Sequence, residues 1–272
     1  MQTPSAISEE VDFLNRKVLD LNNLLIESEK AKSRFLSLVA NELNNPMTAI
    51  LGMLPRFTPQ ENDPQRELFD LLQSEALALS FRIQNLVAAA EVESGDIGFS
   101  NALIHPYELV EEALNALRFP IKEKKIKLHS VNTLTSPIVS DPLKLYLIIV
   151  NILANAVCYG NRDGNIDIKI EEDGISLFIS VTDEGRGPDV EFKPQIFTRF
   201  ANGPTGGHGL GIGLSIVRAL CERMEGSIDY VEQEGTVTFT VQLPLITQLP
   251  DSMACGSNDF MFDSFDDDAI EL

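Results

Sequence analysis

The sequence predicts an α+β protein in which a helical hairpin is followed by a two-layer α/β sandwich. Up to about residue 97, apolar residues recur at spacings of three and four, which is the periodicity of one helix face. Residues 98–245 mix such helical patterns with short runs of β-branched and aromatic residues that are typical of strands. Helices and mainly antiparallel strands in this order favour two packed layers.

Residues 1–31 are predicted to form an N-terminal coiled-coil helix. Apolar residues recur there in a heptad seam, at Val11, Leu14, Val18, Leu21 and Leu25. Two helices associate through such a seam. The pattern resumes further along the chain, so we expect one long helix from about Glu9 to Leu54, which is stable only when it packs against a partner.

Residues 32–97 are predicted to form the hairpin. The segment RFTPQENDP reads as a loop, with Asp63 expected to cap the second helix and Pro64 to open it. Gly95 is the expected C-cap where that helix ends. Because a single hairpin cannot bury the apolar faces of both helices, we expect a homodimer in which two hairpins form a four-helix bundle.

The sandwich is predicted from the segments of residues 98–245. The expected helices are YELVEEALNAL, PLKLYLIIVNILANAV and GLSIVRALCERM. The expected strands are NIDIKIEE, ISLFISVTD, GSIDYVEQ and TVTFTVQL. Residues 246–272, which are acidic and contain no basic residue, are expected to be a disordered tail that either keeps the protein soluble or folds onto a partner.

Charge and composition narrow the classes of function. A net charge of -20 disfavours binding to nucleic acid or anionic lipid and favours basic protein surfaces. No apolar run reaches the about 20 residues that span a bilayer, and no signal peptide is visible, so a cytoplasmic protein without membrane insertion is expected. The three cysteines lack partners at metal spacing and are expected to be free thiols, at Cys158, Cys221 and Cys255.

Three polar or glycine-rich clusters follow one another in the sandwich. Asn151 and Asn155 lie one helical turn apart, where an amide oxygen suits Mg²⁺ and amide nitrogens suit phosphate oxygens. DEGRG, residues 183–187, ends an apolar strand with an acidic acceptor and two glycines. GGHGLGIGLSIV, residues 206–217, places glycines before a helix whose N-terminus can receive phosphates. Each cluster alone is common, but their order, with IFTRF between the last two, is specific.

On these motifs the chain resembles the sensor histidine kinases over roughly residues 32–245. DPLKLYLIIVNILANAV resembles the N box of that family, VTDEGRG its first glycine box, IFTRF its F box and GHGLGIGLSIV its second glycine box. The resemblance implies the ATP-binding sandwich shared by histidine kinases, gyrase, Hsp90 and MutL. It also implies ATP or ADP and Mg²⁺ as cofactors.

The resemblance implies roles for individual residues. Asn155 would ligate Mg²⁺, Asn151 would contact phosphates and Asp183 would hydrogen-bond the adenine amino group. The glycines would shape the pocket and its lid, at Gly185, Gly187, Gly207, Gly209 and Gly211. The preceding hairpin distinguishes the kinases from other proteins with this sandwich.

FLSLVANELNNPM resembles the H box of the family, and Asn41 stands where the phosphate-accepting histidine belongs. An imidazole has a basic ring nitrogen that can attack a γ-phosphate, whereas a carboxamide nitrogen is neither basic nor nucleophilic. Asn41 is therefore expected to be inert as a phospho-acceptor. The three histidines lie outside the hairpin, with His105 in the linker, His129 in a probable strand and His208 among the lid glycines. They are expected to be ordinary surface or core residues.

Glu42, Asn45 and Pro46 are retained in the H box. In relatives with phosphatase activity, an amide or hydroxyl at the position of Asn45 orients a water that attacks the phospho-aspartate of a response regulator. The alternative is that Asn45 is only a helix-surface amide. Pro46 removes a backbone hydrogen bond and is expected to bend the helix.

The nucleotide-binding part departs from the family as well. Cys158 stands where a basic residue is often found, and the lid segment ANGPTGG, residues 201–207, contains no lysine or arginine. Loss of these charges weakens the electrostatic stabilisation of phosphoryl transfer. Nucleotide binding is therefore expected, and autophosphorylation is expected to be absent.

Two functions follow. In the first, the chain is a pseudokinase of a two-component system that binds ATP or ADP and regulates a response regulator or another histidine kinase by protein contact. In the second, it is an enzyme that dephosphorylates a response regulator through Asn45 or phosphorylates a histidine of a partner subunit. The missing histidine and lid charges favour the first function, and Asn45 keeps the second open.

Overall fold

The fold is given by a computed structural model that describes residues 15–19, 21–22, 25, 28, 38–39, 42–60, 63–95, 97–134, 136–185, 187, 196–198 and 211–246. The described residues between 15 and 39 are helical, and the coiled coil stays a prediction. Some expectations lie outside the described residues, namely those for Asn41, for the lid segment of residues 201–207 with Gly207, for His208 and Gly209, and for residues 247–272 of the acidic tail.

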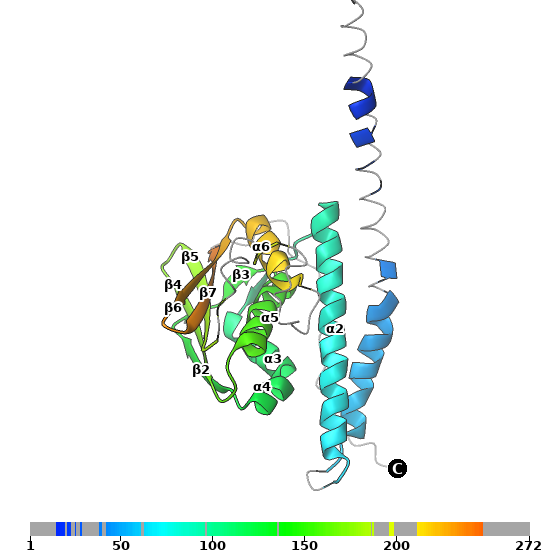
Figure 1. The fold of residues 1–272 in the computed structure, drawn as a ribbon, viewed down its shortest axis with the longest axis vertical. Coiled ribbons are helices and arrows are strands. Elements are labelled where there is room, and N and C mark those ends of the chain that lie inside the picture. The colour runs from blue at the N-terminus through cyan, green and yellow to red at the C-terminus, as the bar shows by residue number, and fades with distance from the viewer. Residues whose placement is uncertain are drawn as a thin grey trace, which may run out of the picture.

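The N-terminal part of the chain forms the predicted helical hairpin. Residues 42–53 are helical, and a short 3-10 helix, η1 (Leu54–Phe57), precedes the turn into α2 (Arg66–Ser94). Figure 1 shows the helix of residues 42–53 running beside α2. Met47 and Ile83 are buried between the two helices, and three apolar side chains pack around them, those of Ala76, Leu86 and Val87. The two helices therefore share a small core of their own.

The prediction is wrong for the start of α2 and is confirmed for its end. The expectation that Asp63 caps the helix is wrong, because its Oδ1 accepts a hydrogen bond from the N–H of Gln65 at 2.8 Å and the helix begins only at Arg66. Asp63 and Pro64 instead form the turn before the helix, since an aspartate side chain readily satisfies the backbone two residues on. At the other end Gly95 is the predicted C-cap, in the left-handed conformation with φ 76°.

A five-stranded sheet forms one layer of the sandwich. Its strand order is β2-β4-β5-β7-β6, with β2 parallel to β4 and the other neighbours antiparallel. The strands are β2 (Lys127–Asn132), β4 (Asn165–Glu172), β5 (Ser176–Asp183), β6 (Ser227–Gln233) and β7 (Thr236–Pro244). The last four of these agree closely with the predicted strands.

Helices form the second layer. They are α3 (Pro106–Ala116), α4 (Arg118–Lys124), α5 (Pro142–Tyr159) and α6 (Gly213–Arg223). Figure 1 shows this helical layer lying between the sheet and α2, so that the hairpin packs on the helical side of the sandwich. Two short antiparallel strands, β1 (Ala102–Ile104) and β3 (Ile138–Ser140), form a second sheet that is separate from the five-stranded one. The prediction did not include α4, β1 or β3.

The core lies between α5 and the sheet. From α5 it takes the fully buried Leu145, Ile148, Ile149 and Ile152. From β4 it takes alternate residues, Ile166, Ile168 and Ile170, while the residues between them face outward, as strand geometry requires. By length and composition α5 would also suit a membrane span, but here it is the central core helix of the sandwich. Burial of this apolar surface fixes the helix that carries both N-box asparagines.

Candidate functional site

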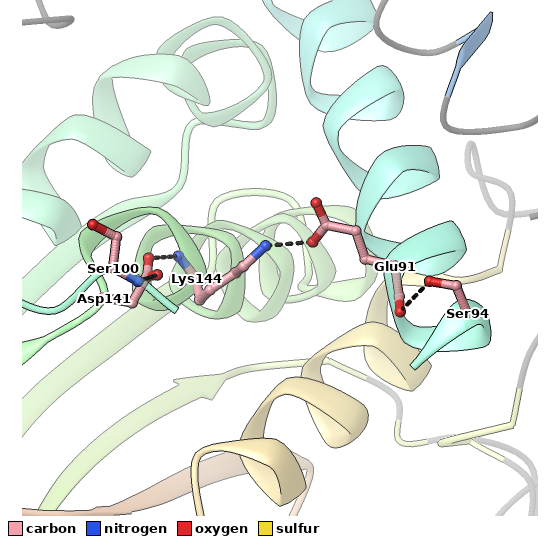
Figure 2. A network of polar contacts seen from close by, with 5 residues as sticks. All are labelled: Glu91, Ser94, Ser100, Asp141 and Lys144. Carbon is pink, nitrogen blue, oxygen red and sulfur yellow. Dashed lines mark hydrogen bonds and ion pairs between the residues drawn. The ribbon is translucent and has the colours of Figure 1, made fainter. Parts of the chain in front are cut away.

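Asp141 fixes the start of α5. One of its carboxylate oxygens, Oδ1, accepts a hydrogen bond from the N–H of Lys144 at 2.9 Å, and the other, Oδ2, accepts one from the N–H of Ser100 at 2.7 Å (Figure 2). Asp141 is buried, and of its two bonds the one from Lys144 is buried and the one from Ser100 is partly buried. An N-cap of this kind sets where the first turn begins. It thereby sets the directions of the side chains further along α5.

Asn151 and Asn155 leave α5 one turn apart, as predicted, but in different surroundings. Asn151 is 5% exposed and Asn155 is half-buried. The Nδ2 of Asn151 donates to the carbonyl of Leu147 at 2.8 Å and to Oδ1 of Asn85 at 2.8 Å. Asn85 donates back from its Nδ2 to Oδ1 of Asn151 at 3.1 Å. The first N-box asparagine is thus paired with a residue of the hairpin helix α2.

Asp183 ends β5 as a buried acid. Its exposed fraction is 2%, and none of the residues that the structure describes donates a hydrogen bond to its carboxyl group. Burial raises the pKa of Asp183 to about 7, and the positive charge of Lys124 offsets part of this rise. A buried, poorly satisfied acceptor of this kind is suited to an N–H donor from a bound ligand.

Lys124 supplies the positive charge at this end of the site. Its Nζ donates to the backbone carbonyls of Cys158 at 2.5 Å and Gly160 at 3.3 Å, so the C-terminus of α5 holds the lysine in place. The sequence prediction missed Lys124. In the sequence Lys124 stands in a run that contains several lysines, and nothing in that run shows which lysine turns toward Asp183.

Gly185 brings the backbone of the first glycine box against the end of α5. It forms an isolated bridge with Gly160. A Cβ at Gly185 would lie 2.5 Å from Oδ1 of Asp183 and 2.6 Å from the carbonyl oxygen of Tyr159. Any side chain there would displace the carboxyl group or the helix end. The glycine is therefore needed for the close approach that buries Asp183.

The other end of the site lies where α6 begins. Gly213, the first residue of α6, packs so closely on Asn151 that a Cβ would lie 2.5 Å from its Oδ1. Gly211, two residues earlier, has φ 65°, a conformation that favours glycine. Gly187 is half-buried beside Glu232. The structure thus brings Asn151 to the N-terminus of a helix, where backbone N–H groups favour anions.

The described part of the F box packs on the edge of the sheet. Phe197 lies edge-on to Tyr230 of β6, with ring centroids 6.3 Å apart, and Tyr230 stacks on Phe239 of β7 at 5.9 Å. Such aromatic pairs add stability beyond the area they bury. They tie the segment before the lid to the sheet.

The two parts of the candidate site, one at the start of α6 and one at Asp183, are joined by the C-terminal half of α5. Asn151 is at the α6 end and Tyr159 is at the Asp183 end, which by helical rise are about 12 Å apart. Asn155 lies between them. The arrangement suits an elongated ligand that has an N–H donor at one end and an anionic group at the other. The residues therefore fit an adenine nucleotide, with the amide oxygen of Asn155 as the available oxygen ligand for a cation such as Mg²⁺.

The retained residues of the H box do not lie with this group. Glu42 and Asn45 are both exposed on the first hairpin helix. Figure 1 shows α2 lying between that helix and the sandwich. In this arrangement the hairpin residues and the predicted nucleotide residues form two separate sites. His105 precedes α3, and His129 is exposed on β2, so neither adds to the hairpin site.

Two family models match the chain. Residues 31–95 match the His Kinase A (phospho-acceptor) domain, and residues 140–247 match the Histidine kinase-, DNA gyrase B-, and HSP90-like ATPase. The chain belongs to the sensor histidine kinase family. The first match lies on the hairpin and the second on the α/β sandwich, as the resemblance implied.

Curated relatives match most of this chain. Sensor histidine kinase ZraS of Escherichia coli strain K12 is 27% identical over 245 residues, 86% of this chain and 51% of the relative. The uncharacterized sensor-like histidine kinase R01002 of Rhizobium meliloti strain 1021 is 31% identical over 223 residues, 76% of this chain and 42% of the relative. The chain therefore spans about half the length of the curated relatives it matches, or less.

Solved structures share the fold. Full-length ShkA in complex with AMPPNP matches with a TM-score of 0.57 at 24% identity, over 80% of this chain and 47% of ShkA. The histidine kinase AdeS of Acinetobacter baumannii matches with a TM-score of 0.53 at 24% identity, over 75% of this chain and 97% of AdeS. At this level of identity the likeness concerns the fold alone.

Asn85, like Lys124, is a residue of the candidate site that the sequence prediction missed. It lies on α2, far from the N box in sequence, and is 6% exposed. The available signal was an amide surrounded by apolar positions in RIQNLVAAA. Such a residue marks a polar contact with another element but does not identify its partner.

Proposed function

We propose that this chain is a pseudokinase of a two-component system, which binds ATP or ADP and regulates a response regulator or another histidine kinase by protein contact. The observation that carries the proposal is the residue Asn41, directly before Glu42 within the match to the phospho-acceptor domain. Its carboxamide nitrogen has no free lone pair with which to attack a γ-phosphate.

The geometry of the sandwich supports nucleotide binding. Asp183 offers an acceptor for the adenine amino group, the backbone at Gly185 permits close approach, and the start of α6 favours phosphates. A bound ATP would supply a transferable γ-phosphate. Asn155 is the residue we propose for Mg²⁺, which needs further oxygens from phosphates and water.

The charges around the site support weak or absent phosphoryl transfer. The lid segment ANGPTGG has no lysine or arginine, and Cys158 stands at a position that is often basic in the family. Lys124 is held at the Asp183 end by carbonyl groups of α5, away from the start of α6. Among the described residues, Lys124 therefore places a positive charge near the proposed adenine and away from the start of α6, where we propose the phosphates and where transfer requires such a charge.

Exposed apolar residues on the hairpin support a homodimer. They are Leu43, Ile50, Met53, Leu68, Leu72 and Leu79, each at least 43% exposed. Exposed apolar side chains of this kind are covered in a four-helix bundle of two hairpins. We place this part of the protein in the cytoplasm, where ATP and response regulators occur, with the coiled coil as its route of input.

A titration with ADP tests the nucleotide part of the proposal. The wild-type chain should bind in a calorimetric titration with Mg²⁺, and Asn155→Ala should weaken binding at least about tenfold, the loss of one charge-assisted contact. Asn161→Ala removes an exposed amide just beyond the end of α5 and should change nothing. A wild-type chain that does not bind ADP would show that the site is vestigial.

A second function, in which the chain acts as an enzyme on a partner, is favoured by one observation. Asn45 and Glu42 are both exposed on the hairpin, where a response regulator could reach them. In this case Asn45 would orient a water toward the phospho-aspartate of the regulator. Phosphorylation of a histidine on a partner subunit is the other form of this proposal, and it depends on the nucleotide site.

Loss of phosphate from a regulator separates the two functions. A regulator phosphorylated by a small-molecule donor should lose phosphate at the same rate with and without this chain if the first function holds. If the chain speeds the loss and Asn45→Ala abolishes the effect, the enzyme function holds. Asn44→Ala, which removes the neighbouring half-buried amide, is the matched control.

A further inference from the structure

The pair formed by Asn85 and Asn151 joins the hairpin to the nucleotide site. The two amides exchange hydrogen bonds of 2.8 Å and 3.1 Å, and both residues are buried. A buried reciprocal pair of this kind is well satisfied, because each amide uses both a donor and an acceptor. Breaking it would leave polar atoms unpaired unless a ligand or water replaced the lost partner.

The donors of Asn151 are fully used. A carboxamide nitrogen carries two hydrogens. One is donated to the carbonyl of Leu147 and the other to Oδ1 of Asn85. No hydrogen of Asn151 is left for a phosphate oxygen in this arrangement. Of the two acceptors, Leu147 belongs to α5 itself, so Asn85 is the one that a movement of the hairpin can remove.

The pair also lies at the phosphate end of the site. Gly213 at the start of α6 is in contact with Oδ1 of Asn151, the atom that accepts the hydrogen bond from Asn85. The structure shows no side-chain cap at this N-terminus, whose Ncap residue is Ile212. The amide of Asn85 therefore lies next to Asn151 and near the start of α6, which is where we expect the phosphates.

Other polar contacts fasten α2 to the sandwich on both sides of this pair. Lys144 of α5 forms an ion pair with Glu91 (Figure 2). Arg223 of α6 donates to the carbonyl of Gly95 at 2.9 Å, and Arg118 of α4 donates to the side chain of Gln73. Within this set, only the contact of Asn85 involves a residue with an expected role in nucleotide binding.

We propose that Asn85 is a competitor of the nucleotide phosphates for Asn151, so that nucleotide binding and docking of α2 on the sandwich oppose each other. This inference rests on the proposed nucleotide site. A phosphate oxygen takes the hydrogen of Asn151 that Asn85 now accepts, and α2 loses its buried contact. By linkage, whatever holds α2 in place weakens nucleotide binding by the same factor by which nucleotide weakens docking.

Binding measurements on the full chain test the competition. Asn85→Ala should raise the affinity for ADP by about fivefold or more, the usual lower range of coupling between sites. Gln84→Ala removes a neighbouring amide of α2 that is not among the hydrogen-bond partners described for the Asn151 side chain, and it should leave the affinity unchanged. Adenosine, which has no phosphates, should gain less than ADP from Asn85→Ala.

The results separate this inference from the proposed function. Binding of ADP by the wild type with equal or weaker binding by Asn85→Ala would overturn the competition while the nucleotide site stands. An equal gain for adenosine would overturn it too. If neither protein binds ADP, the proposed nucleotide site is wrong and the competition falls with it.

Hydrogen exchange gives a second readout that does not depend on a gain of affinity. In the wild type, ADP should speed amide exchange in the C-terminal half of α2, because the docked state is depleted. In Asn85→Ala this exchange should already be fast without ADP. Slower exchange of α2 on addition of ADP to the wild type would contradict the proposal.

Discussion

Lys144 of α5 and Glu91 of α2 form an ion pair between the sandwich and the hairpin. The Lys144 side chain is 7% exposed and the Glu91 side chain 30%, so the pair is shielded mainly on the side of the sandwich. The same residue, Lys144, donates its backbone N–H to Asp141 at the helix start. One residue thus links the beginning of the N-box helix to the hairpin (Figure 2).

Lys144→Met should lower the free energy of unfolding by about 1–2 kcal/mol. It leaves the stem in place but removes the charge, so that Glu91 loses its partner at a partly buried site. Lys169→Met is the matched control, because Lys169 and Glu171 form a pair of 2.8 Å whose side chains are 54% and 41% exposed. That pair should contribute less than about 1 kcal/mol. Urea unfolding measures both, and equal losses would contradict the difference in burial.

Asp141→Ala should lower the free energy of unfolding by about 1–2 kcal/mol, because it removes the N-cap of α5 together with the bond to Ser100. Asp141→Asn retains one acceptor oxygen and should lose less. Thermal unfolding checks the order of the three proteins. If Asp141→Asn were the less stable of the two variants, the account of the cap would be wrong.

Asp183 should make stability fall as the pH rises. Its pKa is raised to about 7 in the folded protein, so the folded state holds a proton that the unfolded state has lost between about pH 4 and pH 7. The contribution of this group is therefore complete at pH 3 and is lost as the pH passes 7, with a slope of at most about 1.4 kcal/mol per pH unit.

Asp183→Asn isolates that contribution. Its amide has no such titration, so the difference in free energy of unfolding between variant and wild type should grow in favour of the variant from pH 4 to pH 7. Urea unfolding at each pH gives the difference. A difference that does not vary with pH would show that the carboxyl group is not protonated in the folded state.

Gly213→Ala should weaken both the fold and nucleotide binding. The added Cβ would lie 2.5 Å from Oδ1 of Asn151, so the amide or the start of α6 must move. Gly52→Ala is the matched control, because no atom lies within 4 Å of a Cβ at this helical position. It should stabilise the hairpin helix by about 0.5–1 kcal/mol. Opposite signs of the two changes in urea unfolding are expected, and equal signs would contradict the packing at Gly213.

The elements with strong periodicity could be predicted from the sequence. The apolar run of α5 and the alternation of β4 gave their positions within a few residues, and Gly95 gave the end of α2. The first helix of the hairpin followed from the same spacing rule. These features depend on local patterns that burial then reinforces.

Other elements carry no such pattern. The strand expected around His129 is confirmed as β2, but all six of its residues are exposed, so no alternation of buried and exposed positions marks where it begins and ends. α4 has seven residues and contains Pro120, which reads as a break. These two elements form because neighbours hold them, β2 by pairing with β4 and α4 by packing on α2 and α3.

The sequence supplied candidate residues for the site, whose roles stay predictions, but not the contacts that these residues make. The order of motifs identified Asn151, Asn155 and Asp183 as candidates, since their chemistry follows from residue type. The partners Asn85 and Lys124 come from other elements, and their positions depend on how α2 and α4 pack against α5. Sequence spacing within one element cannot give such contacts.

The most direct measurement is incubation of the purified chain with γ-labelled ATP and Mg²⁺, followed by tests for acid-labile phosphate. Asn41→His is the matched variant, because it restores a ring nitrogen to the H box. The account predicts that the wild-type chain stays unlabelled while it binds nucleotide. Acid-labile label on the wild-type chain, located to a histidine by mass spectrometry, would contradict the central claim.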